Sequence, residues 1–500
     1  MPPSRCLLRL SQPPSSLLAA PIAPHTSTSI RHAAPFSASA SQCMPAPAKK
    51  KGVTFGGPPA RGTKALRIKK TVRQSTARPP APGERKALRK RIVLSNTNAL
   101  EVAGLRDATL DSLVDEAMVG KVVGLPGQVV DSLRAVEAFK VHQGWGLFRR
   151  PACLVRKETV EIGRVVAEAG EEKKTRRLVL CGERNSGKSV LLLQGLAGAF
   201  MRGWVVVNFP EAKDLTIGHT AYSPIPNTTP TQYAQRTYTA NLLSQISKAN
   251  NSILSTLQIT QSHDLPMPLQ RNLTLDRLCE LGARDPDISW PIFQALWKEL
   301  TAPGRPPIFM ALDGLAHVMR LSAYLAPDMK PIHAHDLALV NHFVEYLSGR
   351  RELSNGGVVM AAVSESNQPR TPALEHALAA AETRQADAAR GTEIAQGAEG
   401  ETSKPRRRQP ESFLEHQLRS LKHWNPYVKG DERVIKALDG VEVLRLKGLS
   451  REEARGVMEY YAASGMLRNT VTEGFVSEKW SLAGQGIVGE LERAAVRLRV

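Results

Sequence analysis

The residues whose spacing indicates chemistry most clearly lie between Leu178 and Phe200. There an apolar run leads into Gly182, and Gly187-Lys188-Ser189 opens a second apolar stretch with a helical pattern. A G-x-x-x-x-G-K-S motif between a strand and a helix is typical of a phosphate-binding P-loop. The alternative is a chance match in a glycine-containing turn. The predicted nucleotide-binding residues are Gly182, Glu183, Arg184, Asn185, Ser186, Gly187, Lys188, Ser189 and Val190.

Each residue type in this motif has a physical role. Glycines allow a tight turn whose N–H groups approach phosphate oxygens, and the N-terminus of the following helix faces the same anion. Lys188 is expected to reach the β- and γ-phosphates. The Ser189 hydroxyl is expected to bind Mg²⁺. The predicted ligands are therefore a purine nucleotide and Mg²⁺.

A second apolar run, Ile308 to Leu312, ends in Asp313. In this context Asp313 is predicted to be a Walker B carboxylate, which holds Mg²⁺ opposite Ser189. Many P-loop ATPases with an inserted strand carry Glu after this Asp as the base that aligns water. Here the residue is Gly314, so we expect nucleotide binding with little or no turnover, and we assign no catalytic residue.

A third buried strand is predicted from Gly356 to Val363, and it ends in Ser364. In related ATPases a polar side chain at this place senses phosphate, so Ser364 is a candidate phosphate sensor. A serine that ends a strand is also ordinary turn chemistry.

The N-terminal segment has the composition of a targeting sequence followed by a basic extension. No Asp or Glu precedes Glu84, and residues 1–43 are rich in Ser, Ala and Leu with scattered Arg, which indicates a mitochondrial transit peptide. Residues 1–91 hold 18 Lys and Arg against one Glu, so they account for most of the net charge of +20. We expect residues 44–91 to be disordered when alone and to bind ribosomal RNA through its phosphates. An ordinary solubilising tail is the alternative.

Composition divides the remaining chain into three parts. Residues 92–378 are predicted to form an α/β domain with a parallel sheet and flanking helices. Residues 379–412 contain few large apolar side chains, so we expect a disordered insertion there. Residues 413–500 are expected to form a mostly helical domain. No stretch after the N-terminal segment approaches the ~20 apolar residues of a membrane span, so no membrane partner is expected.

Five segments together resemble a known family, the mitochondrial small-subunit ribosomal proteins called death-associated protein 3, in their fungal form. The resemblance covers roughly residues 120–500 apart from 379–412. It implies a P-loop NTPase-like fold of the AAA/ASCE type with a helical C-terminal lid. The segments are the motif ending at Ser189, Val205 to Pro210, Ala311 to His317, Gly356 to Ser364, and Gly448 to Ala454 with Tyr460-Tyr461.

The resemblance also implies residence in the small subunit of the mitochondrial ribosome, in the matrix, with ribosomal RNA and other ribosomal proteins as partners. It favours GTP or GDP as the nucleotide, with ATP as an alternative. Relatives tend to keep Gly-Asn-Pro-Arg near the end, whereas this chain has Gln485-Gly-Ile-Val-Gly489.

The competing hypothesis is a matrix NTPase that acts as an RNA-remodelling or signalling switch.

Overall fold

The computed structural model describes residues 92–270, 272–365, 369, 371–397 and 431–496. The predicted transit peptide (1–43) and basic extension (44–91) lie outside the described residues, as do residues 398–430. None of the described helices is long and apolar enough to cross a membrane.

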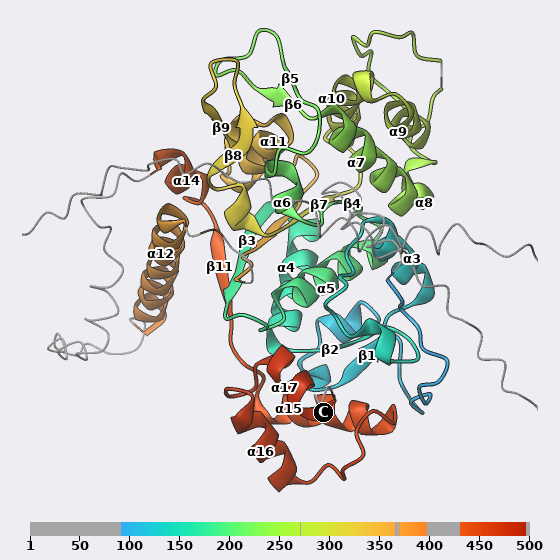
Figure 1. The fold of residues 1–500 in the computed structure, drawn as a ribbon, viewed down its shortest axis with the longest axis vertical. Helices are drawn as coiled ribbons and strands as arrows, with labels where there is room; N and C mark the ends of the chain where they lie inside the picture. The colour runs from blue at the N-terminus through green and yellow to red at the C-terminus, as the bar shows by residue number, and fades with distance from the viewer. Residues whose placement is uncertain (1–91, 271, 366–368, 370, 398–430, 497–500) are drawn as a thin grey trace, which may run out of the picture. The chain divides into compact units, whose positions relative to one another are not determined.

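A five-stranded parallel sheet forms the centre of the described chain (Figure 1). The strand order is β11-β3-β10-β7-β4, and all four pairings are parallel. The buried stretches of β3, β4, β7 and β10 are mostly apolar because helices pack on both faces of the sheet. The predicted parallel sheet with flanking helices is thereby confirmed. The strands are β3 (Thr175–Gly182), β4 (Val205–Phe209), β7 (Ile308–Asp313), β10 (Gly357–Ala362) and β11 (Glu442–Leu446).

The register of this sheet aligns the ends of the three strands that precede the glycine-rich loop, Gly314 and Ser364. Ala362 of β10 pairs with Leu180 of β3 on one side and with Asp313 of β7 on the other. The carboxyl ends of the three strands therefore lie at one edge, because parallel strands end in the same direction. This edge brings together the glycine-rich loop after β3, Asp313 and Ser364.

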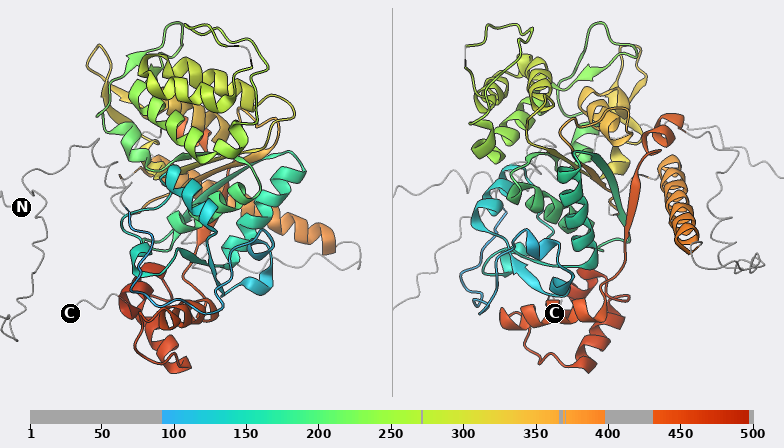
Figure 2. Two further views of the ribbon diagram at one scale, coloured as in Figure 1. Left: turned by 90° about the vertical axis from the view of Figure 1, so that its right-hand side faces the viewer. Right: turned by 180° about the vertical axis from the view of Figure 1, so that it is seen from behind.

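Alternate side chains of the strands point into two separate cores. One core joins residues such as Leu178 and Leu180 to helices α3 (Gly127–Ala135), α4 (Lys157–Glu171) and α5 (Lys188–Met201). The other core joins the opposite set of side chains to six further helices, and the two layers are visible in Figure 2. These helices are α7 (Arg236–Ala249), α9 (Leu275–Arg284), α10 (Ser289–Leu300), α11 (Ala338–Leu347), the start of α12 (Pro372–Gly397) and α14 (Glu432–Ala437).

Short elements complete the N-terminal and central parts. The pairs β1 with β2, β5 with β6 and β8 with β9 are antiparallel. These elements are η2 (Asp111–Leu113), η3 (Glu116–Met118), β1 (Val122–Gly124), η4 (Trp145–Leu147), β2 (Ala152–Leu154), α6 (Ala212–Thr216), β5 (Ser223–Pro224), β6 (Tyr233–Ala234), α8 (Asn251–Leu254), η5 (Pro286–Ile288), η6 (Leu315–His317), β8 (Leu321–Leu325), β9 (Pro331–His333) and η7 (Ala334–Asp336).

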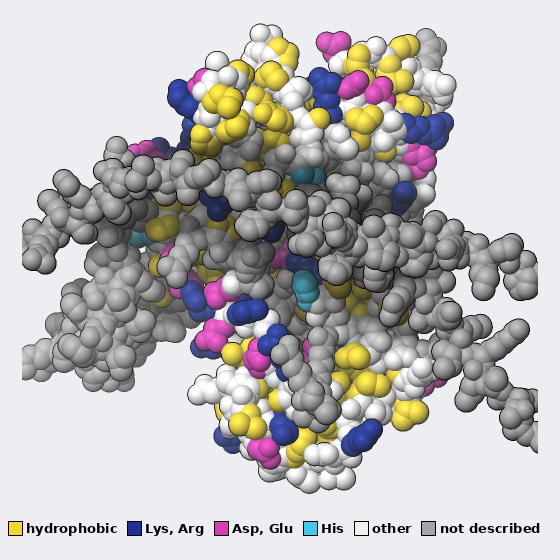
Figure 3. Space-filling view, in the orientation of Figure 1, with side chains coloured by type: hydrophobic (Ala, Val, Ile, Leu, Met, Phe, Trp, Pro, Cys, Tyr) yellow, Lys and Arg dark blue, Asp and Glu magenta, His cyan; other side chains and the backbone are white. Residues whose placement is uncertain are grey.

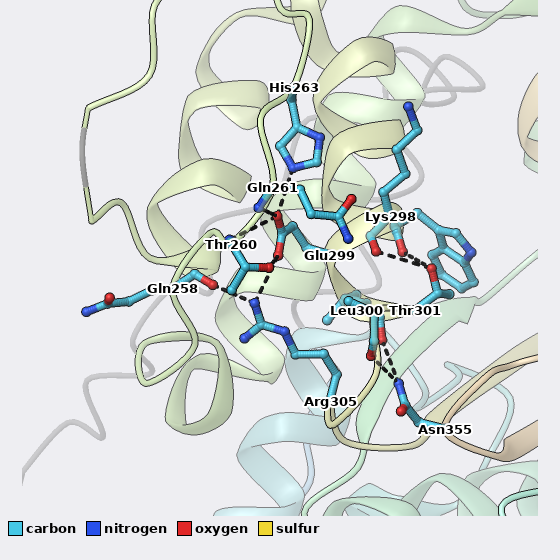
Figure 4. Close-up of polar contacts among 12 residues, drawn as sticks. Gln258, Thr260, Gln261, His263, Lys298, Glu299, Leu300, Thr301, Arg305 and Asn355 are labelled. Carbon is cyan, nitrogen blue, oxygen red and sulfur yellow. Dashed lines mark hydrogen bonds and ion pairs between the residues drawn. The ribbon is translucent and has the colours of Figure 1, made fainter.

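A buried carboxylate anchors the loop between α8 and α9 to helix α10 (Figure 4). The Glu299 side chain is fully buried and accepts hydrogen bonds from Thr260 N (3.1 Å), Thr260 Oγ1 (2.8 Å) and Gln261 N (2.7 Å). His263 Nε2 and Arg305 Nη2 each lie 2.9 Å from the same carboxylate. Burial alone raises the pKa of Glu299, but these hydrogen bonds outweigh it and lower the pKa to about 2.

The expectation of a disordered insertion over 379–412 is wrong for its first half, because α12 continues through Gly397. The segment lacks large apolar residues, but its many alanines favour a helix and need little room at a packed surface. Leu374 and Leu378 anchor the start of the helix in the core. Within the segment itself Ala381 is buried, and Arg445 of β11 forms an ion pair with Glu382. Figure 2 shows α12 beside β11. Residues 398–412 lie outside the described part.

The predicted boundary of the C-terminal domain at 413 also differs from the structure. Helix α14 packs into the core of the first domain, and β11 is an edge strand of the central sheet. The separate helical unit therefore begins after β11, at about residue 449, and has its own small core. It comprises α15 (Arg451–Ala463), α16 (Glu473–Leu482) and α17 (Val488–Ala495).

Candidate nucleotide-binding site

The glycine-rich loop turns through left-handed backbone angles between β3 and α5. The φ values are 142° at Gly182, 62° at Asn185 and 97° at Gly187. A Cβ atom at Gly182 would lie 2.6 Å from Leu446 O, so the end of β11 packs directly against this turn. Helix α5 then begins at Lys188. In its first turn the N–H groups of Val190 and Leu191 donate to Gly187 O, so within the described residues those of Lys188 and Ser189 are the ones available to an anion.

Lys188 lies with its ammonium folded back against this loop. Its Nζ donates to Gly182 O at 2.7 Å and to Glu183 O at 2.6 Å. Burial lowers the pKa of Lys188, while the negative charges of Glu365 and Asp313 oppose that shift. A desolvated cation held by neutral carbonyl groups gains from contact with an anion.

The remaining loop residues differ in exposure. Ser186 is buried, and its Oγ has no hydrogen-bond partner within the described chain, which is the pattern of a group that pairs with a ligand or water. This orphaned hydroxyl and the Lys188 cation fit a phosphate group. Glu183 and Arg184 are exposed, whereas Asn185, Gly187, Ser189 and Val190 are partly buried.

Asp313 is buried at the end of β7, but its carboxylate already has a cation beside it. Lys140, from the loop after α3, forms an ion pair with Asp313 Oδ2. The Ser189 hydroxyl and the Asp313 carboxylate are oxygen donors that Mg²⁺ accepts. A metal ion bound to Asp313 must therefore compete with the Lys140 ammonium, a feature that the motif did not indicate.

The structure gives a backbone reason for glycine after Asp313. Gly314 has a φ of 91° and is the N-cap residue of the short helix η6. Any other residue is strained in this conformation, so a glutamate at 314 would carry an additional cost. Ser364 follows β10 at the same edge of the sheet and is partly buried, and the next residue, Glu365, is exposed.

Arg156 is a residue of this site that sequence reasoning missed. Its side chain is buried, and it donates to Ser186 O of the loop at 2.9 Å and to Lys447 O at 2.8 Å. Glu158 Oε2 lies 3.3 Å from its Nε. One guanidinium thus ties the glycine-rich loop to the segment after β11. Its position just before a helical pattern gives no local signal of contacts so far along the chain.

The helical C-terminal unit also contacts the loop directly. Gly489 N donates to Asn185 O at 3.0 Å, and Asn185 Nδ2 donates to Glu490 Oε1 at 2.9 Å. The hydrogen bond from Asn185 lowers the pKa of Glu490. A Cβ at Gly489 would lie 2.7 Å from Asn185 Cβ, so this close approach requires glycine. Gly489, the last residue of the segment Gln485 to Gly489, therefore meets the loop through its backbone.

Comparison with known proteins identifies the family. Residues 153–494 match the family described as mitochondrial ribosomal death-associated protein 3. The chain is 45% identical over 451 residues to small ribosomal subunit protein mS29 of Neurospora crassa, with 89% of each chain covered. It is 21% identical over 355 residues to the mS29 protein of Schizosaccharomyces pombe, over 69% of this chain and 65% of the relative. The chain belongs to the mitochondrial ribosomal death-associated protein 3 family.

Proposed function

We propose that this protein is a structural component of the small subunit of the mitochondrial ribosome, in the matrix. Both mS29 relatives bear the name of a small-subunit protein, and the N. crassa relative matches nearly the whole chain. On this proposal its partners are ribosomal RNA and neighbouring ribosomal proteins. The acid-poor N-terminal segment supports import into mitochondria.

We further propose that the subunit protein holds a purine nucleotide at the loop between β3 and α5. The observation that carries this proposal is the buried Lys188 ammonium, whose partners are the carbonyls of its own loop. Lys188 would exchange these carbonyls for β- and γ-phosphate oxygens, and the N–H groups at the start of α5 would bind the same anion. Arg156 and Gly489 would hold the loop in its curved shape.

A bound Mg²⁺ would neutralise charge on the phosphate oxygens, with Ser189 and Asp313 as its protein ligands. For Asp313 this role depends on release from Lys140. Ser364 is placed at the same edge of the sheet and is the proposed phosphate sensor. The family resemblance favours guanine over adenine.

Slow or absent turnover is part of the proposal, because Gly314 supplies no carboxylate. The competing function is an NTPase switch, and Glu365, whose charge acts on Lys188, is a candidate for its base. Single-turnover hydrolysis by the purified protein decides between them. Turnover at ~1 s⁻¹ or faster, lost in both Lys188→Ala and Glu365→Gln, would favour the switch.

Two measurements test the structural role and its ligand. Sedimentation of matrix extract should show the protein in stoichiometric amount with the small subunit, and mass spectrometry of the nucleotide released from that fraction should identify the base. Migration away from the subunit would contradict the ribosomal role. A subunit fraction that contains the protein but releases no purine nucleotide would contradict nucleotide binding alone.

The proposed contact between residues 44–91 and ribosomal RNA has its own test. Deletion of this segment removes 15 Lys and Arg. If many of them touch phosphates, the log–log dependence of RNA affinity on salt should flatten by several units, since each contact contributes about 0.7–0.9. An unchanged slope would show that the RNA contact lies elsewhere.

A further inference from the structure

Strand β8 presents an apolar face to solvent. Leu321 and Leu325 are 52% and 40% exposed, and Ala323 between them is exposed as well. Ser322 and Tyr324 point to the buried side of the strand. A half-exposed antiparallel strand normally alternates apolar-inward with polar-outward. On β8 all three outward-facing residues are apolar. A strand face that contacted only water would be expected to carry polar residues.

Two further apolar side chains extend this row. Met329, in the turn between β8 and β9, is 74% exposed at a φ of 61°, a conformation costly for a large side chain. Tyr222 is 38% exposed and donates to Leu325 O at 2.5 Å. In Figure 3 hydrophobic side chains gather over β8 and β9. We call Tyr222, Leu321, Ala323, Leu325 and Met329 the β8 face.

Packed aromatic rings support the β8 face from its interior side. The Tyr222 ring packs edge-on against Tyr324 at 4.7 Å and against Tyr233 at 5.9 Å. Gln235 Nε2 donates to the Tyr324 hydroxyl at 2.9 Å. A surface that is ordered before binding loses little conformational entropy when a partner docks. Contiguous exposed apolar patches of this kind mark interaction sites, whereas single exposed apolar residues need no explanation.

The charged side chains that line a hollow beside this face indicate the class of partner. Leu321 lines a hollow of about 450 Å³ together with three carboxylates and two cations. Lys330 is paired with Asp328 at 2.9 Å and Arg433 with Asp336 at 3.1 Å. The third carboxylate, Asp431, lies 2.9 Å from His333 Nε2, and burial lowers the pKa of that imidazole. The hollow is thus acidic on balance and does not favour an RNA backbone.

We propose that the β8 face binds an apolar segment of another protein of the mitochondrial small ribosomal subunit. An aliphatic or aromatic side chain of that segment rests on Leu321 and Leu325, and a neighbouring Lys or Arg enters the hollow toward Asp431. Charge complementarity favours this occupant over nucleic acid. The inference rests on the proposed ribosomal role, and the experiments below separate the two.

The first experiment identifies the occupant by photo-crosslinking. A benzophenone amino acid replaces Leu321 in the full chain, which is assembled into small subunits before irradiation. The expected product is a crosslink to a ribosomal protein peptide that has apolar residues and a Lys or Arg within a few positions. A crosslink to ribosomal RNA, to residues 1–91 of this chain or to a second copy of it would overturn the proposal.

The second experiment measures how much the face contributes to assembly. The double variant Leu321→Glu, Leu325→Glu should reduce incorporation into the small subunit by about tenfold or more, as expected for central anchors of an interface. Both side chains are partly exposed, so its melting temperature should stay close to that of the unmodified protein. Leu482→Glu is the matched control, because Leu482 is 70% exposed on α16, outside the β8 face.

The outcomes of these experiments distinguish the two proposals. If the unmodified protein does not sediment with the small subunit, the ribosomal role itself fails. If it does, and the double variant assembles as well as the Leu482→Glu control, the β8 face is not an interface and this inference alone fails.

Discussion

Two buried charges, Glu299 and Lys188, are surrounded in opposite ways. The Glu299 carboxylate accepts hydrogen bonds from the backbone and side chains of one loop and pairs with Arg305. Lys188 donates to two neutral carbonyls of its own loop, and burial lowers its pKa. Glu299 is stabilised in its charged form, so it serves the fold. Lys188 is desolvated and has no contacting anion among the described residues, so it is suited to bind one.

Buried charges with structural roles and buried charges with binding roles differ in how their neighbours compensate burial. Burial alone does not distinguish them, since it disfavours the charged form of both residues. The difference lies in whether the surrounding groups compensate that cost. For Glu299 they lower the pKa to about 2, and for Lys188 they leave its pKa below the ordinary value.

Glu299→Ala should lower the free energy of unfolding by about 3–5 kcal/mol, because it leaves Arg305 and several donors without their buried partner. Urea denaturation measures the change. The control is Glu352→Ala, which removes an exposed partner of Arg177 and should cost less than about 1 kcal/mol. Equal effects of the two substitutions would contradict a structural role for the Glu299 network.

The same carboxylate should make folding sensitive to acid. Its folded pKa of about 2 lies below the ordinary value of 4.5, so its contribution of about 3 kcal/mol is complete above pH 4.5. That contribution is lost as the pH falls from 4.5 toward 2. The free energy of unfolding of Glu299→Gln should therefore change less between pH 5 and pH 3 than that of the unmodified protein. Parallel pH profiles would be inconsistent with the lowered pKa.

Nucleotide should stabilise the protein, and Lys188→Ala should remove that effect. A ligand at a hundred times its dissociation constant adds ~2.7 kcal/mol to the free energy of unfolding. Loss of the charged contact should weaken binding ~10-fold to 150-fold, equivalent to ~1.5–3 kcal/mol. Thermal melting with and without GDP measures both. Lys174→Ala, at an exposed lysine paired with Glu172, should leave the shift intact. A full GDP shift in Lys188→Ala would refute the assigned site.

Lys140→Met should increase the dependence of nucleotide binding on Mg²⁺. The substitution removes the ammonium that pairs with Asp313 and frees this carboxylate for the metal. The ratio of GDP affinity in Mg²⁺ to affinity in EDTA should rise by about tenfold, or ~1.4 kcal/mol. Titration calorimetry of both proteins gives this ratio. An identical ratio in the variant would mean that Lys140 does not compete with the metal.

The sequence by itself determined the sheet and its polar edge. The strands ending at Gly182, Asp313 and Ala362 are apolar runs that a local pattern indicates, and parallel strands bring their carboxyl ends together. The spacing of the motif alone identified Lys188 as a candidate phosphate ligand and Ser189 as a candidate Mg²⁺ ligand. The distribution of Lys, Arg, Asp and Glu along the sequence assigns most of the net charge of +20 to residues 1–91.

Tertiary structure decided the partners of these residues. Arg156, Lys140 and Glu490 reach the site from segments that carry no motif, and long-range packing alone brings them there. The part of helix α12 beyond residue 378 has no sequence signal, because it carries small side chains such as the buried Ala381 and an ion pair with β11, which hydrophobic periodicity does not register. The sequence shows that position 314 lacks the glutamate expected of a catalytic base. Only the folded backbone, with a φ of 91° at Gly314, shows why that position holds glycine.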